Sequence, residues 1–170
     1  NTRTLLEELE KGEIEFALIE GNASHRRYCC RPFYTARFSA LGSPAGPWAA
    51  CKTLEGLCAA PLLLREAGSG SREILESALA ARDLSPEDFA ACHVFESVPV
   101  LLELAAAGRG VTFAYEVAAA PLLESGRLAR LAQGDFSITR PFAFVTLPDS
   151  PFERQEQYLF ERIRDLCRGL

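Results

Sequence analysis

The sequence lacks an apolar run of the roughly 20 residues that a membrane-spanning helix requires. It opens with the polar segment NTRTLLEELEKGE, whereas a secretory leader places basic residues before an apolar core. It contains no G-x-S-x-G, H-E-x-x-H or G-K-[ST] motif, and its AAGRG segment does not match a dinucleotide fingerprint. These absences predict a soluble protein with no visible export signal and no enzymatic activity.

Cysteine and histidine are present, but without the spacing of a metal site. The six cysteines include no C-x-x-C pair and form no cysteine–histidine pair at zinc-finger spacing. We therefore expect no metal and no cofactor. Several cysteines lie inside apolar runs, so we expect reduced, buried thiols, as in a cytoplasmic protein. His93 has no serine or carboxylate at motif spacing, which favours a packed or exposed imidazole over a catalytic base.

Length and charge favour one globular domain that does not itself bind nucleic acid. The chain has 170 residues, of which 48% are hydrophobic and 24% charged, with a formal net charge of −5. This composition suits a domain with a sizeable core, and its acidic balance opposes phosphate binding. The short basic cluster HRRYCCR at 25–31 is better explained as a solvated turn before a strand than as a nucleic-acid patch.

Hydrophobic periodicity predicts alternating helices and strands. A helix is expected over 2–11, ending before Gly12, and the run FALI at 16–19 predicts a strand covered on both faces, as in a parallel sheet. Residues 27–42 predict one or two strands, with Pro32 interrupting the ladder. The remaining predictions are a turn-rich connection at 42–49, strand 60–66, helix 71–82, a single turn at 85–88, strand 91–97, a helix from Ser97 to Gly108, strand 110–115, a helix around Pro121, strand 127–131 and strand 140–148.

The last helix has the clearest start signal. Ser150, Pro151 and Glu153 fit the N-cap, first and third positions, and the helix is expected to bury Leu159, Ile163 and Leu166.

The segment LLLREAGSGSREILESAL at 62–79 predicts a binding site where a strand leads into a helix. The N–H groups at a helix N-terminus are unpaired and carry partial positive charge. Ser69, Gly70 and Ser71 could thus receive a carboxylate, sulfate or phosphate, with Arg72 adding charge or pointing into solvent. The alternative is a plain helix cap and turn. Glu66, at the end of the strand, has no partner in the sequence that would suggest acid–base work.

Four motifs, in order, resemble the effector-binding domain of LysR-type transcriptional regulators. NTRTLLEELEKGEIEFALIEG is similar to the family's G-N-T start followed by L-x-x-G-E-x-D-x-A-I, and SPAGPWA to S-P-x-H-P-L-A, with Gly46 and Trp48 replacing the histidine and leucine. LREAGSGSRE resembles R-E-x-G-S-G-T-R, and LLELAAAGRGVTFAYEVAAAPLLESGRLARL resembles L-V-x-A-G-x-G-I followed by G-x-L.

The resemblance implies an α/β, two-lobed fold like that of type 2 periplasmic binding proteins. Two Rossmann-like lobes would be joined by two crossover strands, with a small-molecule cleft between them. Lobe I would hold 1–37 and 114–170, and lobe II 38–113. The family's winged helix-turn-helix and the first strands of lobe I would precede residue 1.

The resemblance also implies the function: sensing of a small anionic effector by a DNA-binding regulator. The expected contacts are Ser69, Gly70, Ser71, Ser97, Thr112 and Phe113. Capping alone would explain Ser97, and core packing would explain Phe113. DNA would be bound only through the missing N-terminal domain, and we expect a homodimer or tetramer in the full-length protein that is weakened in this chain.

Two alternatives share the expected fold. A solute-binding protein of a transporter would need a leader or lipid anchor upstream, and six unpaired cysteines suit the periplasm poorly. An enzyme of the prephenate dehydratase type would need a convergent acid–base set in the cleft, and none is visible in the sequence.

Overall fold

The computed structural model describes residues 2–21 and 27–168, and their contacts form two compact units. Unit 1 comprises 1–36 and 139–170, and unit 2 comprises 37–138. The boundaries fall within β2 (Cys29–Gly42) and β7 (Ser137–Thr146), so the chain passes between the units inside strands. Unit 2 therefore includes residues 114–138, which were expected in lobe I. The division into two lobes remains a prediction.

Unit 1 combines α1 (Thr2–Glu10), β1 (Ala17–Glu20) and α6 (Glu153–Cys167) with the outer parts of β2 and β7. The first helix forms as predicted, burying Leu9 and ending before Gly12, whose φ of +71° suits glycine. β2 runs through Pro32 as a single strand. One buried hydrophobic cluster of this unit consists of Leu9, Ala17, Ile19, Ala143 and Val145.

The prediction that the first strand is covered on both faces is wrong. β1 pairs with β7 in antiparallel register, with Leu18 opposite Phe144. Ala17 and Ile19 are buried, whereas Leu18 between them is 42% exposed. An antiparallel strand needs only one apolar face. The continuous run FALI therefore predicted the strand correctly, but the inference that both of its faces are buried is wrong.

The last helix starts later and buries a different face than predicted. α6 begins at Glu153 after Phe152, and the Ser150 hydroxyl accepts a hydrogen bond from Phe152 N at 3.2 Å. Glu156 and Phe160 are the buried residues, while Leu166 is 72% exposed. Phe160 faces inward because its ring packs edge-on against Phe144 of β7.

The sheet of unit 2 contains both parallel and antiparallel strands. β3 (Pro61–Arg65) pairs in parallel with β4 (Ala91–Phe95) on one side and with β5 (Val111–Tyr115) on the other. β5 then pairs antiparallel with β2, which also pairs with β6 (Ala129–Leu131). β3 therefore lies at the centre of the parallel part of this sheet, with strand order β2-β5-β3-β4.

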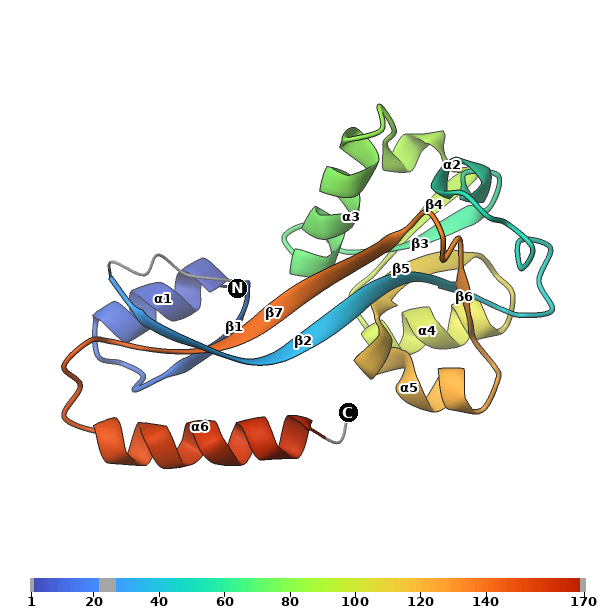
Figure 1. Cartoon of the computed structure of the whole chain (residues 1–170). Helices are drawn as coiled ribbons and strands as arrows, with labels where there is room; N and C mark the ends of the chain where they lie inside the picture. Colours follow the sequence, from blue (N-terminus) through green and yellow to red (C-terminus); the bar gives the residue numbers. More distant parts are fainter. Residues whose placement is uncertain (1, 22–26, 169–170) are drawn as a thin grey trace. The chain divides into compact units, whose positions relative to one another are not determined.

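The helices of unit 2 cover both faces of this sheet (Figure 1). α3 (Gly70–Ala80) packs on the face that carries Leu62 and Leu64, and α4 (Val98–Ala106) and α5 (Glu116–Glu124) pack on the opposite face. The short α2 (Leu54–Leu57) and the 3₁₀ turn η1 (Pro86–Asp88) complete the unit. Alternate side chains of β3 thus enter different cores, as expected for a strand buried on both faces.

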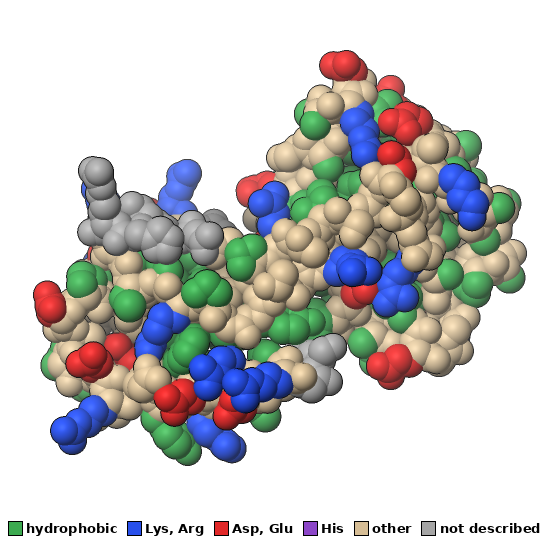
Figure 2. Space-filling view, in the orientation of Figure 1, with side chains coloured by type: hydrophobic (Ala, Val, Ile, Leu, Met, Phe, Trp, Pro, Cys, Tyr) green, Lys and Arg blue, Asp and Glu red, His purple; other side chains and the backbone are tan. Residues whose placement is uncertain are grey.

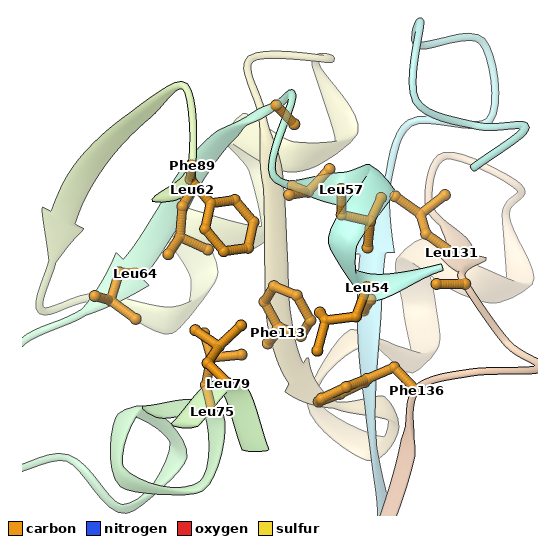
Figure 3. Close-up of a cluster of buried hydrophobic side chains, with 14 of the residues drawn as sticks. Leu54, Leu57, Leu62, Leu64, Leu75, Leu79, Phe89, Phe113, Leu131 and Phe136 are labelled. Atoms are coloured by element: carbon orange, nitrogen blue, oxygen red, sulfur yellow. The ribbon is translucent and has the colours of Figure 1, made fainter. Parts of the chain in front are cut away.

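The core beneath α3 is rich in leucine and phenylalanine (Figure 3). Phe113 lies at its centre, with its ring centroid 4.9 Å from that of Phe136 and 6.3 Å from that of Phe89, both edge-on. Leu75 and Leu79 of α3 are also almost fully buried here. The helix predicted over 71–82 is therefore confirmed as α3.

The expectation of buried thiols is wrong. None of the six cysteines forms a disulfide, but Cys29 and Cys92 are exposed and the other four are half-buried. Partial burial raises the pKa of the Cys58 thiol above its ordinary value. Within the described ranges, no helix is both long and apolar enough to cross a bilayer.

Candidate functional site

The topology of unit 2 marks one edge of its sheet as a binding position. From β3 the chain passes through α3 to β4 on one side, and from β4 through α4 to β5 on the other side of β3. The two connections depart in opposite directions, which makes the carboxyl ends of β3 and β5 a topological switch point, the kind of position at which open α/β sheets form a crevice. In open α/β sheets ligands bind in such crevices.

The Gly/Ser corner lies at the carboxyl end of β3, as the sequence predicts. Gly68, with φ +86°, turns the chain, and Ser69 takes the N-cap position of α3. The Ser69 hydroxyl accepts a hydrogen bond from Arg72 N at 3.4 Å and lies 3.4 Å from the Ser71 hydroxyl. The N–H groups of Gly70 and Ser71 have no acceptor among the described residues. Two backbone donors and the Ser71 hydroxyl are therefore available at this corner.

Two arginines stand beside the corner. A shallow hollow with no room for a water molecule is lined by residues of β3, α3 and β5. Arg65, Ser71 and Arg72 supply its polar atoms, and the Arg72 guanidinium also donates to the Arg65 carbonyl at 3.4 Å. Arg65 was not among the site residues expected from the sequence. Its position as a charged residue at the end of a buried strand could have indicated it.

Both arginines already have carboxylate partners. Arg65 donates two hydrogen bonds to Glu66, at 2.7 and 2.8 Å, and Arg72 donates one to Glu76 at 2.7 Å. The hydrogen bonds from Arg65 lower the pKa of Glu66 below its ordinary value. The expectation that Glu66 has no partner is therefore wrong, and the positive charge of the corner is largely balanced.

Ser97 lies at the same edge of the sheet, because Arg65 and Phe95 are in register on β3 and β4. It occupies the N-cap position of α4, yet its hydroxyl makes no capping hydrogen bond. The side chain is exposed. The Ser97 hydroxyl therefore does not cap α4, which was the alternative explanation for a serine at this position. It is accessible to a ligand.

Thr112 and Phe113 both face the interior. Thr112 is fully buried, and its hydroxyl donates to the Leu63 carbonyl at 2.9 Å. Phe113 is 4% exposed and forms one wall of the hollow. The structure therefore brings Phe113 to the corner, whereas the Thr112 hydroxyl is used to hold β5 against β3.

A second polar cluster lies where β5 leads into α5. The Glu116 carboxylate accepts hydrogen bonds from the Ser39 hydroxyl at 2.7 Å and from Arg130 at 2.8 Å. Burial tends to raise the pKa of Glu116, but the hydrogen bonds from Arg130 and Ser39 outweigh it, so the pKa is lowered. The ion pair with Arg130 connects α5 to β6, and the hydrogen bond from Ser39 connects α5 to β2.

Metal-ligating side chains are not grouped in the part of the chain that the structure describes. No three side chains of His, Cys, Asp or Glu within 2–21 and 27–168 are close enough to hold a metal ion. His93 is exposed on β4, and His25 lies outside the described residues.

Several solved regulatory domains share this arrangement. The regulatory domain of HypT from Salmonella typhimurium, in its apo form, matches with a TM-score of 0.79 and 18% identity, covering 100% of this chain and 80% of its own. The regulatory domain of CcmR from Synechocystis PCC6803 in complex with 2-PG matches with a TM-score of 0.76 and 15% identity, covering 100% and 81%. The fold is thus the mixed α/β, periplasmic-binding-protein-like fold of regulatory domains, as predicted.

The chain belongs to the LysR substrate binding domain family, whose model matches residues 1–168. It is thereby a ligand-sensing regulatory domain of the LysR type, which confirms the resemblance found in the sequence. The HTH-type transcriptional regulator BbuR from Bordetella bronchiseptica is 26% identical over 171 residues, covering 99% of this chain. The chain spans about half, 52%, of the length of that curated relative.

Proposed function

We propose that this domain senses a small anionic metabolite at the N-terminus of α3. The observation that carries the proposal is the pair of N–H groups at Gly70 and Ser71, which have no acceptor among the described residues. They lie at the carboxyl end of β3, beside the crevice between β3 and β5. Donors of this kind at a helix N-terminus suit a carboxylate, sulfate or phosphate group.

The other predicted contacts take different parts in this proposal. Ser71 donates its hydroxyl to the ligand, and Ser69 holds the first turn of α3 in place. Ser97 offers a second hydroxyl at the same edge of the sheet. Phe113 forms an apolar wall, and Thr112 acts through the packing of β5 on β3.

We further propose that the whole protein is a cytoplasmic DNA-binding transcription regulator. The name of BbuR, an HTH-type regulator, and the length of BbuR beyond the matched half support a DNA-binding segment outside this chain. The ligand would change the angle between lobe I (1–37 and 114–170) and lobe II (38–113), and thereby the arrangement of the DNA-binding parts. It does so only to the extent that it prefers one arrangement. The full-length protein would be a homodimer or tetramer, and the domain would sense ligands without catalysing a reaction.

Thermal unfolding of the chain in the presence of candidate ligands tests this proposal. A panel of carboxylates, sulfur oxyanions and amino-acid derivatives would be screened for a rise in Tm. A ligand at a hundred times its Kd stabilises the folded state by about 2.7 kcal/mol, which corresponds to a rise of roughly 5–10 °C for a domain of this size. Ser71→Leu fills the corner with an apolar side chain and is expected to abolish the shift.

Ser77→Leu provides the matched control, because Ser77 is exposed on the same helix, away from the corner. This variant should bind like the wild type. A ligand-induced rise in Tm that survives Ser71→Leu would place the ligand elsewhere and contradict the proposed site.

A further inference from the structure

The arginine at the end of β3 is held by the residue that follows it. Arg65 donates from Nε to one carboxylate oxygen of Glu66 at 2.7 Å and from Nη2 to the other at 2.8 Å. Glu66 also begins the turn of the Gly/Ser corner, because its carbonyl accepts a hydrogen bond from Ser69 N at 3.3 Å. Arg65 and Ser71 line the same hollow. The ion pair therefore belongs to the corner at which the metabolite site is proposed.

The hollow at this corner is closed by the protein itself. It has no room for a water molecule, so an anion reaches the Arg65 guanidinium there only if a side chain moves. Leu63, Leu75 and Phe113 line the hollow and are buried in the cores of unit 2, so their movement would disrupt close packing. The Glu66 side chain is 35% exposed and can turn into solvent. Glu66 is thus the group that can make way for a ligand.

Glu66 occupies the edge of the guanidinium that recognises carboxylates. The Nε and Nη2 atoms of an arginine form a planar fork that matches the two oxygens of a carboxylate or of a similar oxyanion. Since the hydrogen bonds from Arg65 lower the pKa of Glu66, this carboxylate is ionised at neutral pH. On the face of unit 2 seen in Figure 2, basic side chains lie next to acidic ones in several places. An anion must therefore compete with the protein's own carboxylates.

We propose that Glu66 masks Arg65 in the ligand-free domain and that an anionic ligand takes the place of Glu66 on this guanidinium. The oxyanion group of the ligand then contacts Arg65 and Ser71, and the Glu66 carboxylate is released into solvent. Arg65 exchanges one anionic partner for another, so its charge is paired in both states. This inference rests on the proposed function and adds that the site is autoinhibited, favouring ligands with a two-oxygen anionic group over simple anions.

Titration of the chain with sodium sulfate, followed by NMR, tests the masking. Sodium chloride at equal ionic strength is the reference, because chloride cannot bridge the two N–H groups of the fork. The Ser71 amide and the Arg65 Nε–H signals should shift together with sulfate, since the anion binds as Glu66 leaves. Sulfate stabilises folded proteins in general, so a rise in Tm alone would not suffice.

Two charge-removing variants separate masking from net charge. Glu66→Gln should lower the half-saturating sulfate concentration about fivefold or more, because a neutral carboxamide competes poorly for the fork. Glu73→Gln is the matched control, since Glu73 is exposed in the first turn of the same helix. It removes the same charge without freeing Arg65, and should change the half-saturating concentration by less than about twofold.

The same substitution in a second background shows whether Glu66 acts through Arg65. In Arg65→Gln the fork is absent, so adding Glu66→Gln should change sulfate binding by less than about twofold. If Arg65→Gln is too unstable to titrate, the comparison of Glu66→Gln with Glu73→Gln still decides the outcome.

The masking is overturned, and the metabolite site retained, if the Ser71 amide responds to sulfate but Glu66→Gln binds no more tightly than the wild type. A gain of equal size in Glu73→Gln would overturn it as well, because the effect would then be one of net charge. If sulfate shifts neither the Ser71 amide nor the Arg65 Nε–H signal beyond chloride in any variant, both the masking and the proposed metabolite site fail.

Discussion

Replacing Gly110 by alanine tests how closely β5 approaches β3 at the amino ends of the two strands. Gly110 precedes β5 and lies beside Pro61, the first residue of β3. A Cβ atom at this position would overlap the Pro61 carbonyl oxygen, and would lie 3.1 Å from Leu63 Cγ and 3.2 Å from the Pro61 carbonyl carbon. Two of these three atoms belong to the backbone, so a side-chain rotation cannot relieve the overlap.

The expected cost follows from this geometry. Overfilling a packed interior costs roughly 1–3 kcal/mol, and a backbone obstacle favours the upper part of that range. Gly134→Ala is the matched control in the same unit, because a Cβ there meets nothing within 4 Å. Alanine restricts the unfolded chain, so Gly134→Ala should stabilise by about 0.4–1 kcal/mol. The two variants should therefore differ by about 3 kcal/mol.

Urea unfolding followed by the fluorescence of Trp48 measures this difference. Trp48 is the single tryptophan and packs against the core beneath α3, so it reports on unit 2. With a slope of about 2 kcal/mol per M, the two midpoints should lie about 1.5 M apart. Equal midpoints for Gly110→Ala and Gly134→Ala would refute the close approach of β5 to β3 at this end of the sheet.

Three further predictions concern single side chains. Ser69→Ala should destabilise by about 1 kcal/mol through loss of the α3 cap, whereas Ser97→Ala should cost almost nothing, both measured by urea unfolding. Glu116→Gln should cost about 1 kcal/mol at pH 7, because the hydrogen bond from Arg130 is then to a neutral group. Since the pKa of Glu116 is lowered, this difference should shrink as the pH falls below the ordinary value of 4.5. Iodoacetamide should label Cys29, which is exposed, ahead of the half-buried thiols, as peptide mass spectrometry would show.

Each of these has an outcome that contradicts it. Equal losses for the two serine variants would mean that Ser69 does not cap α3. A Glu116→Gln cost that grows on acidification would show that the carboxylate is not stabilised by its partners. Labelling of Cys58 as fast as Cys29 would conflict with the burial that raises the pKa of Cys58.

Much of the fold could be predicted because it depends on local signals. The Gly/Ser corner at 68–71 lies where the chain leaves β3, and the helix predicted over 71–82 is α3. Apolar periodicity, caps and glycines act within a few residues, so they can be read directly from the chain. The order of four motifs then identified the family, which the family match confirms.

The environment of each element could not be predicted in the same way. The run FALI was apolar throughout, yet Leu18 is exposed because β1 pairs antiparallel with β7. In α6 the apolar residues lie on two sides, and contact with Phe144 selects Phe160 rather than Leu166 for burial. Pairing direction and the choice of buried face depend on distant segments, which no local window contains.

The amino-acid sequence by itself determined the elements, their order, the family and the position of the Gly/Ser corner. Only the tertiary structure decided which polar groups at the site are already occupied. The Thr112 hydroxyl is bound to the Leu63 carbonyl and Arg65 is bound to Glu66, whereas the N–H groups of Gly70 and Ser71 have no acceptor among the described residues. The physical reason is that hydrogen bonds form between neighbours in space, and folding makes neighbours of residues as far apart as 63 and 112.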